Sequence, residues 1–259
     1  MIRLISLIFA VALLPSPGAT PQAAGSVEVV RVAAASDLKF ALDEVIERLA
    51  ARHPSIRVEP TYGSSGNFHA QIRQRAPFDL FLSADIDYAR DLVSRGLGDE
   101  RDLFTYAEGH LVVWVPNRST LPIEREGLQA LERARRIAIA NPRHAPYGRA
   151  AAAAMRAAGL WPRLESRLVL GENIAQAAQF VQSGSADAGI IAKSLAVAPA
   201  MRAAGRYRDV PQASYPTILQ GGLVLRRASS RNAALLVRDF LLAAEGRALL
   251  GAYGFGFPR

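Results

Sequence analysis

Two stretches near the N-terminus decide the fold: VVRVAAASDL at residues 29–38 and IRVEPTYGSSGN at residues 56–67. Each runs from a strand into a short neutral loop of small hydrogen-bond donors and then into a helix. Helix N-termini carry unpaired backbone N–H groups and a partial positive charge, so they bind anions readily. Two such loops that face one another can hold a small oxyanion without any lysine or arginine.

A signal peptide is predicted at residues 1–25. A basic residue stands near its start, an apolar run follows at residues 4–14, and Pro15 and Pro17 end that run. Small residues at positions 23–25 suit cleavage by a signal peptidase, and the apolar run is too short to span a bilayer. The chain contains no Cys, so we expect no lipid anchor, disulfide or thiolate metal site. We therefore expect an exported protein with no stable insertion into the membrane.

The positive charge of the chain does not indicate a nucleic-acid partner. The net charge is +8, from 31 Lys and Arg against 23 Asp and Glu, but the basic residues are scattered. They form no long run and do not alternate with aromatic residues, as nucleic-acid-binding surfaces often do. We expect no nucleic-acid binding and only a general attraction for anions.

Apolar runs and helical patterns alternate along the rest of the chain. This alternation predicts an α/β architecture with largely parallel sheets, in lobes joined by strands rather than by a flexible linker. We expect strands at residues 29–32, 56–60, 79–84, 110–115, 136–140, 168–170, 188–191 and 218–225. We expect helices at residues 38–49, 65–75, 85–93, 149–158, 174–182, 232–243 and 245–253. The pair Gly221-Gly222 inside a strand predicts a bulge or a close backbone approach.

Four loops share the order strand, donor, helix. Their donor residues are Ser36, Ser64 with Ser65, Tyr147 with Gly148, and Asn173 with Ile174. Simple helix capping explains any one of these loops taken alone. Together, at the carboxyl ends of predicted parallel strands, they favour a small-ligand site, because ligands of open α/β sheets bind at that edge.

The residues give little support to an enzyme. Ser65 and His69 lie four apart on one helix face, but the pattern supplies no third carboxylate for a catalytic triad. His53, His110 and His144 lack the spacing of metal ligands, and no glycine-rich motif indicates a nucleotide site. We expect a binding protein. A hydrolase or transferase on the same scaffold and a ligand-sensing module remain alternatives.

The same motifs resemble those of the periplasmic molybdate-binding proteins of ABC importers. The resemblance rests on AAAS at residues 33–36, YGSS at 62–65, PFDLFLSAD at 77–85, NPRHAPYG at 141–148, GENI at 171–174 and ADAGI at 186–190. It covers nearly the whole mature chain, with the motifs in order. It implies the type II periplasmic-binding-protein fold, an α/β fold of two lobes joined by two crossing hinge strands.

The resemblance also implies how the chain is divided. Residues 26–108 and 218–259 form a discontinuous first lobe, and residues 109–217 form the second lobe. The hinge strands are expected near residues 109–113 and 217–222. The oxyanion is expected to bind between the two lobes.

Four donor positions follow from the resemblance. Ser36 and Ser65 donate hydroxyl and backbone hydrogen bonds from the first lobe, and the backbone N–H groups of Tyr147 and Ile174 donate from the second. Ser64 is a further candidate beside Ser65. All these contacts go to oxygen atoms, so no protein atom is a direct ligand of the molybdenum, and no cofactor is implied.

Two positions depart from the family pattern. The family often carries a Tyr hydroxyl donor after the strand at residues 188–191, where this chain has Ala192 followed by Lys193. Lys193 is therefore a candidate replacement donor; alternatively, it opens the next helix and faces solvent. Asp37 is the second departure, because a carboxylate there favours the helix dipole but repels a dianion unless it is turned away.

The function that the resemblance implies is an extracytoplasmic receptor for molybdate and tungstate. A fully ionised tetrahedral oxyanion offers only acceptors, so a cavity of donors binds it and disfavours protonated anions such as phosphate. The implied partner is an inner-membrane ABC permease with its ATPase, and the receptor is expected to be a monomer. A receptor for sulfate, thiosulfate or another tetrahedral oxyanion remains an alternative.

Overall fold

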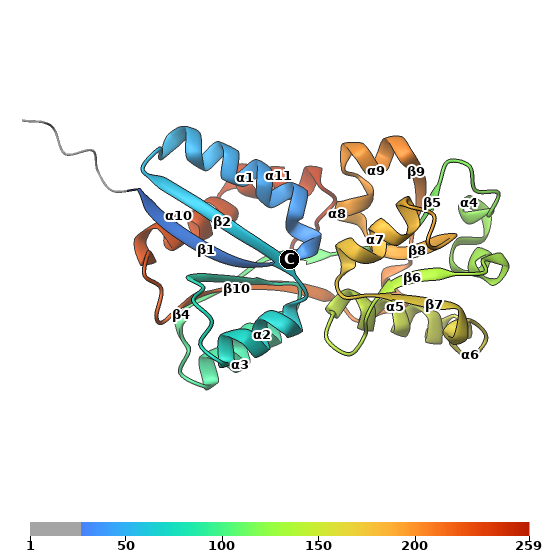
Figure 1. Ribbon diagram of the computed structural model, residues 1–259, viewed down its shortest axis with the longest axis horizontal. Coiled ribbons are helices and arrows are strands. Elements are labelled where there is room, and N and C mark those ends of the chain that lie inside the picture. The colour runs from blue at the N-terminus through green and yellow to red at the C-terminus, as the bar shows by residue number, and fades with distance from the viewer. Residues whose placement is uncertain (1–26, 259) are drawn as a thin grey trace, which may run out of the picture.

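The computed structural model describes residues 27–258, and the predicted signal peptide lies outside them. Within this range the chain builds two five-stranded sheets, each covered by helices to form one lobe (Figure 1). None of the helices in the described range is long and apolar enough to cross a membrane. The predicted α/β fold of two lobes is confirmed.

The first lobe is built on a sheet with the strand order β2-β1-β3-β10-β4. Its elements are β1 (Glu28–Ala35), the 3-10 turn η1 (Ser36–Leu38), α1 (Lys39–Arg52), β2 (Ile56–Gly63), α2 (Ser65–Arg73), β3 (Leu80–Ser83), α3 (Ile86–Ser94), β4 (Gly98–Gly109), β10 (Ile218–Leu225), α10 (Arg231–Leu242) and α11 (Ala244–Ala252). On one face, Leu42, Val237 and Leu249 of α1, α10 and α11 pack with the sheet in one apolar cluster. On the other face, α2 and α3 place Phe68 and Leu92 against the sheet (Figure 1).

The second lobe is built on a sheet with the strand order β7-β6-β8-β5-β9. Its elements are β5 (Leu111–Pro116), α4 (Ile123–Glu126), η2 (Gly127–Arg133), β6 (Ile137–Ala140), α5 (Pro146–Ala157), α6 (Trp161–Leu164), η3 (Glu165–Arg167), β7 (Leu168–Gly171), α7 (Ile174–Gln182), β8 (Ala188–Ala192), α8 (Lys193–Ala196), α9 (Pro199–Ala204), β9 (Gly205–Asp209) and η4 (Gln212–Ser214). Its core includes Trp114 and Ile139 of the sheet, Met155 of α5 and Val181 of α7, all fully buried.

The prediction of largely parallel sheets is wrong in part. β1 pairs in parallel with β2 and β3, and β6 pairs in parallel with β7 and β8. In contrast, β10 is antiparallel to β3 and β4, and β5 is antiparallel to β8 and β9. The chain enters β5 and β10 directly after crossing from the other lobe, so these strands run against their neighbours. A strand buried on both faces reads as an apolar run whichever way it runs, so the sequence pattern does not reveal its direction.

Sequence reasoning also missed two edge strands and the short helices α4, α6 and α9, whereas α8 begins at Lys193 as one alternative predicted. β4 begins with the polar run GDERD, and β9 reads GRYRD. Each is the last strand at one edge of its sheet, where charged side chains protect an exposed edge. Such strands lack the apolar pattern by which a strand is recognised.

The glycine pair in β10 allows close packing on both sides of the strand. The register between β10 and β4 shifts between Gln220 and Gly221, as expected from the prediction of a bulge or a close backbone approach. A Cβ on Gly221 would lie 2.5 Å from Ile86 of α3, and a Cβ on Gly222 would overlap the ring of Phe104 in β4. Both neighbours therefore pack directly on the backbone of the strand that enters the first lobe.

Replacing Gly222 with Ala should destabilise the fold by about 1–3 kcal/mol, because the new methyl group overpacks against Phe104. Gly251→Ala is the matched control: a Cβ there meets Phe257 at an ordinary 3.7 Å, and Ala is the better helix former in α11. Urea denaturation of both variants measures the difference. Stability of the Gly222 variant equal to that of the unaltered protein would contradict this packing.

Candidate functional site

The predicted donor positions meet at one small cavity between the lobes, called the interlobe cavity below. Its lining includes Ser36, Asp37, Ser64, Ser65, Tyr147 and Ile174. The first four follow β1 and β2 in the first lobe, and the last two lie at the starts of α5 and α7 in the second lobe. Its volume is only about 10 Å³. The cavity is therefore small in this arrangement of the lobes.

Ser36 joins the first lobe to the start of α7. Its hydroxyl donates to the side-chain oxygen of Asn173 at 3.1 Å and accepts from the backbone N–H of Ala175 at 3.2 Å. Asn173 is the N-cap of α7, since the same side-chain oxygen accepts from the N–H of Gln176 at 3.0 Å. The Ser36 hydroxyl thus lies among the N–H groups at a helix start that an anion oxygen would use.

The two serines at the start of α2 have different partners. Ser64 is the N-cap of α2: its hydroxyl accepts from the N–H of Asn67 at 3.3 Å and lies 2.9 Å from Nδ1 of His144 in the second lobe. The Ser65 hydroxyl accepts from the N–H of Ala84 at 2.9 Å and has no acceptor for its own proton among residues 27–258. Capping explains Ser64, and the geometry favours Ser65 as the donor toward the cavity.

Tyr147 and Ile174 present backbone donors. Each lies in the first turn of its helix, where an N–H has no partner within the helix. Neither amide makes a hydrogen bond to another described residue. Among the described residues that line the cavity, none is Arg, Lys or His. The positive potential there therefore comes from helix N-termini and not from cationic side chains.

Asp37 lies at the centre of a buried network that connects the lobes. Its Oδ2 accepts from the Tyr147 hydroxyl at 2.9 Å and from Nε2 of Gln220 on β10 at 2.5 Å. Oε1 of Gln220 accepts in turn from the Tyr106 hydroxyl at 2.8 Å. The Ser194 hydroxyl donates to the backbone carbonyl of Asp37 at 2.8 Å. One residue thus holds α5, α8 and the crossing strand β10 together.

The Asp37 carboxyl resists ionisation. Burial raises its pKa from 3.8 to about 6, and the hydrogen bonds from Gln220 and Tyr147 offset only part of this effect. Its Oδ1 is buried and has no partner among the described residues. Burial and the charge of Asp37 raise the pKa of Tyr147 well above its ordinary value, so its hydroxyl remains a donor. A buried carboxylate with one unpaired oxygen costs free energy in its ionised form.

Ala192 and Lys193, in contrast, do not line the interlobe cavity. Ala192 ends β8 and is fully buried. Lys193 opens α8, and its ammonium pairs with Asp209 of β9 at 3.0 Å. Because a carboxylate already neutralises this charge, the structure does not support Lys193 as a replacement donor.

Sequence reasoning missed three members of the network around Asp37, namely Gln220, Tyr106 and Ser194. Gln220 is the one polar side chain in the strand segment ILQGGLVL, and this was a usable signal, because a buried amide needs hydrogen-bond partners. Tyr106 lies in β4, which has no recognisable strand pattern, and Ser194 lies in a helix of four residues. No sequence signal pointed to either of them.

Polar pairs around the cavity hold the lobes in contact. Arg149 of α5 pairs with Asp85 of the first lobe at 2.5 Å. Nδ2 of Asn67 donates to Glu172 at 2.8 Å, and the N–H of Gly66 donates to the carbonyl of His144 at 3.0 Å. These contacts describe a closed arrangement of the two lobes.

The possible Ser65–His69 dyad is not formed. Nε2 of His69 lies 2.6 Å from a carboxylate oxygen of Asp91, so its ring is engaged within the first lobe. Within residues 27–258, no group of three or more His, Cys, Asp or Glu could hold a metal ion.

Comparison with known proteins identifies the family. The family described as bacterial extracellular solute-binding protein matches residues 30–256. The chain belongs to this family. It is therefore a solute-binding protein of the extracytoplasmic type and not an enzyme.

Two relatives of this solute-binding protein match over nearly its whole length. The molybdate-binding protein ModA of Rhodobacter capsulatus is 34% identical over 237 residues, covering 92% of this chain and 90% of that protein. ModA of Azotobacter vinelandii is 32% identical over 230 residues, covering 88% of this chain and 89% of that protein.

Solved structures show the same two-lobe fold. The periplasmic molybdate-binding protein of Azotobacter vinelandii matches with a TM-score of 0.83 at 28% identity, over 89% of this chain and 100% of that chain. The sulfate-binding protein SubI of Mycobacterium tuberculosis H37Rv matches with a TM-score of 0.70 at 18% identity, over 89% of this chain and 86% of that chain. This second match shows the fold alone.

The ionisation of Asp37 should make the stability of this solute-binding protein depend on pH. Burial raises the pKa of Asp37 in the folded state from 3.8 to about 6. The protonated acid therefore adds its full contribution to the free energy of unfolding below pH 3.8, and this contribution is lost as the pH rises through about 6. A pKa difference of about 2 between the folded and unfolded states corresponds to roughly 3 kcal/mol in the free energy of unfolding.

The Asp37→Asn variant isolates this effect, because its amide is neutral at every pH. We expect the stability of the unaltered protein to fall relative to the variant by roughly 2–2.5 kcal/mol between about pH 4 and pH 7.5. Urea denaturation across this range measures the difference. A difference that stays constant with pH would show that Asp37 does not titrate as described.

Proposed function

We propose that this solute-binding protein captures molybdate, and also tungstate, in the interlobe cavity and delivers it to an ABC permease. The observation that carries the proposal is the lining of the cavity: neutral donors at the starts of α2, α5 and α7, with no Arg or Lys among the described lining residues. The two ModA relatives, named for molybdate binding, match nearly the whole chain. A fully ionised tetrahedral oxyanion offers only acceptors, so it suits such a lining.

The proposed contacts come from both lobes. Ser36 and Ser65 supply hydroxyl and backbone donors from the first lobe, and the amides of Tyr147 and Ile174 supply donors from the second. All four contact oxygen atoms of the anion and none contacts the metal. Because the donors come from two lobes built on separate sheets, the anion binds best when the lobes are together, which makes lobe closure part of capture.

The proposed site is selective for dianions when the Asp37 carboxyl is protonated. An ionised carboxylate beside a dianion repels it, so the bound anion favours the neutral acid. The raised pKa, about 6, makes that proton easier to acquire. The protonated Oδ1 then becomes a donor, and the cavity offers no charged acceptor to a partly protonated anion such as phosphate.

The proposal includes the location and the partner. The signal peptide at residues 1–25 directs the protein to the periplasm, where it acts as a monomer. Its partner is an inner-membrane permease with a cytoplasmic ATPase. Membership in an extracellular solute-binding family supports this location and this kind of partner.

The variants Ser36→Ala and Ser65→Ala test the proposed donors. Each should weaken molybdate binding by about 1.5–3 kcal/mol, or roughly 10- to 150-fold, because each removes a hydrogen bond to a charged ligand. Lys193→Met is the matched control and should leave the affinity unchanged, since its ammonium pairs with Asp209 outside the cavity lining. Isothermal titration calorimetry with sodium molybdate measures all three.

Unaltered affinity in both serine variants would refute the donor assignment. The same titrations with tungstate, sulfate, thiosulfate and phosphate rank the anions. If sulfate or thiosulfate bound more tightly than molybdate, the protein would be a receptor for that anion instead.

A further inference from the structure

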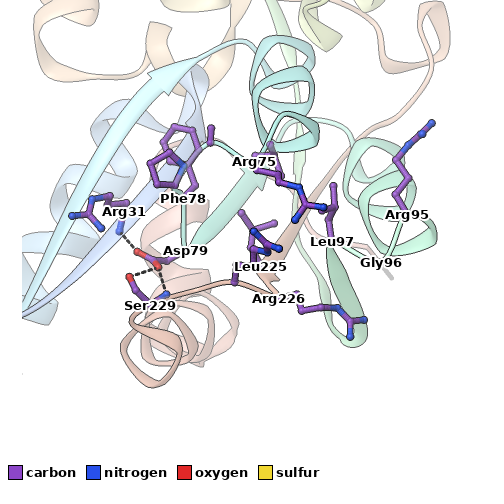
Figure 2. Close-up of a pocket in the computed structure, with 14 residues that line it drawn as sticks. Arg31, Arg75, Phe78, Asp79, Arg95, Gly96, Leu97, Leu225, Arg226 and Ser229 are labelled. Atoms are coloured by element: carbon purple, nitrogen blue, oxygen red, sulfur yellow. Dashed lines mark hydrogen bonds between the residues drawn. The ribbon is translucent and has the colours of Figure 1, made fainter.

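A second and larger cavity lies at the opposite end of strand β3 (Figure 2). Asp79, which precedes β3, lines this cavity, whereas Ala84, which follows β3, lines the interlobe cavity. At a rise of about 3.3 Å per residue, the two cavities lie roughly 15 Å apart. The second cavity has a volume of about 540 Å³, which is typical of pockets that bind small organic molecules.

Guanidinium groups dominate this second cavity. Of the described residues, those with charged side chains in its lining are Arg31, Arg75, Asp79, Arg95, Arg226 and Arg227. The Asp79 carboxylate is buried and already paired: it accepts from the N–H of Arg31 at 2.8 Å and from the N–H and hydroxyl of Ser229 at 2.6 and 2.9 Å (Figure 2). Asp79 therefore shapes the cavity by tying two loops together, and the arginine charges remain in excess.

Some of these arginines are engaged by the protein, and others are not. Arg95 pairs with Asp91 at 2.6 Å, and Arg226 donates to the carbonyl of Gly98 at 3.1 Å. The lining arginines whose side chains make no ion pair or hydrogen bond to another described residue are Arg31, Arg75 and Arg227. Figure 2 shows the Arg31 side chain extending away from Arg75, so Arg75 and Arg227 are the unengaged lining arginines left for an anionic ligand.

Arg75 occupies a strained backbone position. Its φ is 66°, and it is the only non-glycine residue in the described chain with a positive φ. It follows α2, where its N–H donates to the carbonyl of Ile72 at 2.8 Å and the N–H of Ala76 donates to that of Gln71 at 3.0 Å. This is the Schellman helix ending, in which the left-handed residue is usually Gly.

The same chain uses glycine at comparable helix ends. The left-handed residues that follow α3, α5, α7 and α11 are Gly96, Gly159, Gly184 and Gly254. An L-residue is strained in this conformation, so Arg75 lowers the stability of the protein relative to Gly. Figure 2 shows the Arg75 side chain extending from the end of α2 toward Leu97. A charged side chain kept at a strained position beside a cavity favours a role for its charge in binding.

The remaining lining is apolar. Ile72 and Leu225 are buried, and Phe78 and Leu97 are half-buried at the wall. Inorganic anions gain nothing from such a surface, whereas an organic anion buries its apolar part on it. The ligand that fits therefore has two parts of different chemistry.

We propose that this cavity is a second binding site, which takes an organic anion with a phosphate or carboxylate group on an apolar body. Arg75 pairs with the anionic group, and Arg227 adds positive potential around it. The apolar body lies against Ile72 and Leu225. The site is separate from the interlobe cavity and does not depend on the function proposed for that cavity.

Calorimetry of the whole mature protein with phenyl phosphate as the probe tests this site. Arg75→Gly should weaken phenyl phosphate binding tenfold or more and, by relieving the strain, raise the melting temperature by about 2–4 °C. Arg75→Lys should retain most of the affinity. A variant that is more stable yet binds less cannot be explained by misfolding, so the two readouts together separate a binding role from a structural one.

Two controls accompany the test. Arg202→Gln removes the same charge from an exposed position on α9, and Ser65→Ala alters the interlobe cavity; both should leave phenyl phosphate affinity unchanged.

Sedimentation with phosphatidylglycerol vesicles, compared with phosphatidylcholine vesicles, tests whether the anion is a lipid headgroup. Arg75-dependent binding to phosphatidylglycerol identifies a lipid source, and Arg75-dependent binding of phenyl phosphate alone identifies a soluble one. If neither probe binds, or if Arg75→Gly binds as tightly as the unaltered protein, the proposal is overturned.

Discussion

The N–H groups at the starts of α2 and α7 need acceptors, and the arrangement of the two lobes depends on where those acceptors lie. At α2, the N–H of Gly66 bonds to the carbonyl of His144 in the other lobe. At α7, the N–H of Ala175 bonds to the hydroxyl of Ser36 in the other lobe. Each helix start is thus partly satisfied across the interface, and a ligand that offers only acceptors satisfies the donors that remain. The same groups that join the lobes can bind an oxyanion.

Asp37 adds a second constraint to this donor-rich cavity. Its carboxylate is held by Tyr147 from the second lobe and by Gln220 from the crossing strand, so the state of its proton and the contact between the lobes are coupled. The unpaired Oδ1 is destabilising in the free protein. A group that weakens the fold while lying in a candidate site is better explained by ligand recognition than by stability.

Much of the fold and the main donors could be predicted from the sequence, because they depend on local patterns. A strand followed by a small donor and a helix is readable from a few neighbouring residues, and the structure brings Ser36, Ser65, Tyr147 and Ile174 to one cavity. What depends on pairing between distant residues could not be predicted. The direction of β5 and β10, the contact of Lys193 with Asp209 and the role of Gln220 all belong to this class.

The second cavity shows the same limit. Arg75 reads as an ordinary surface residue at a helix end, and only its φ of 66° distinguishes it from the other arginines. The approach of Asp79 to Ser229, which forms one wall, joins residues that lie 150 positions apart. No sequence pattern relates them.

The most direct test of the central claim is a crystal structure of the protein grown with molybdate, with the molybdenum located by its anomalous scattering. The account predicts one strong peak between the lobes, with oxygen atoms within hydrogen-bond distance of the Ser36 and Ser65 hydroxyls and of the amides of Tyr147 and Ile174. A peak at any other place, or no peak in the interlobe cavity at saturating molybdate, would contradict it.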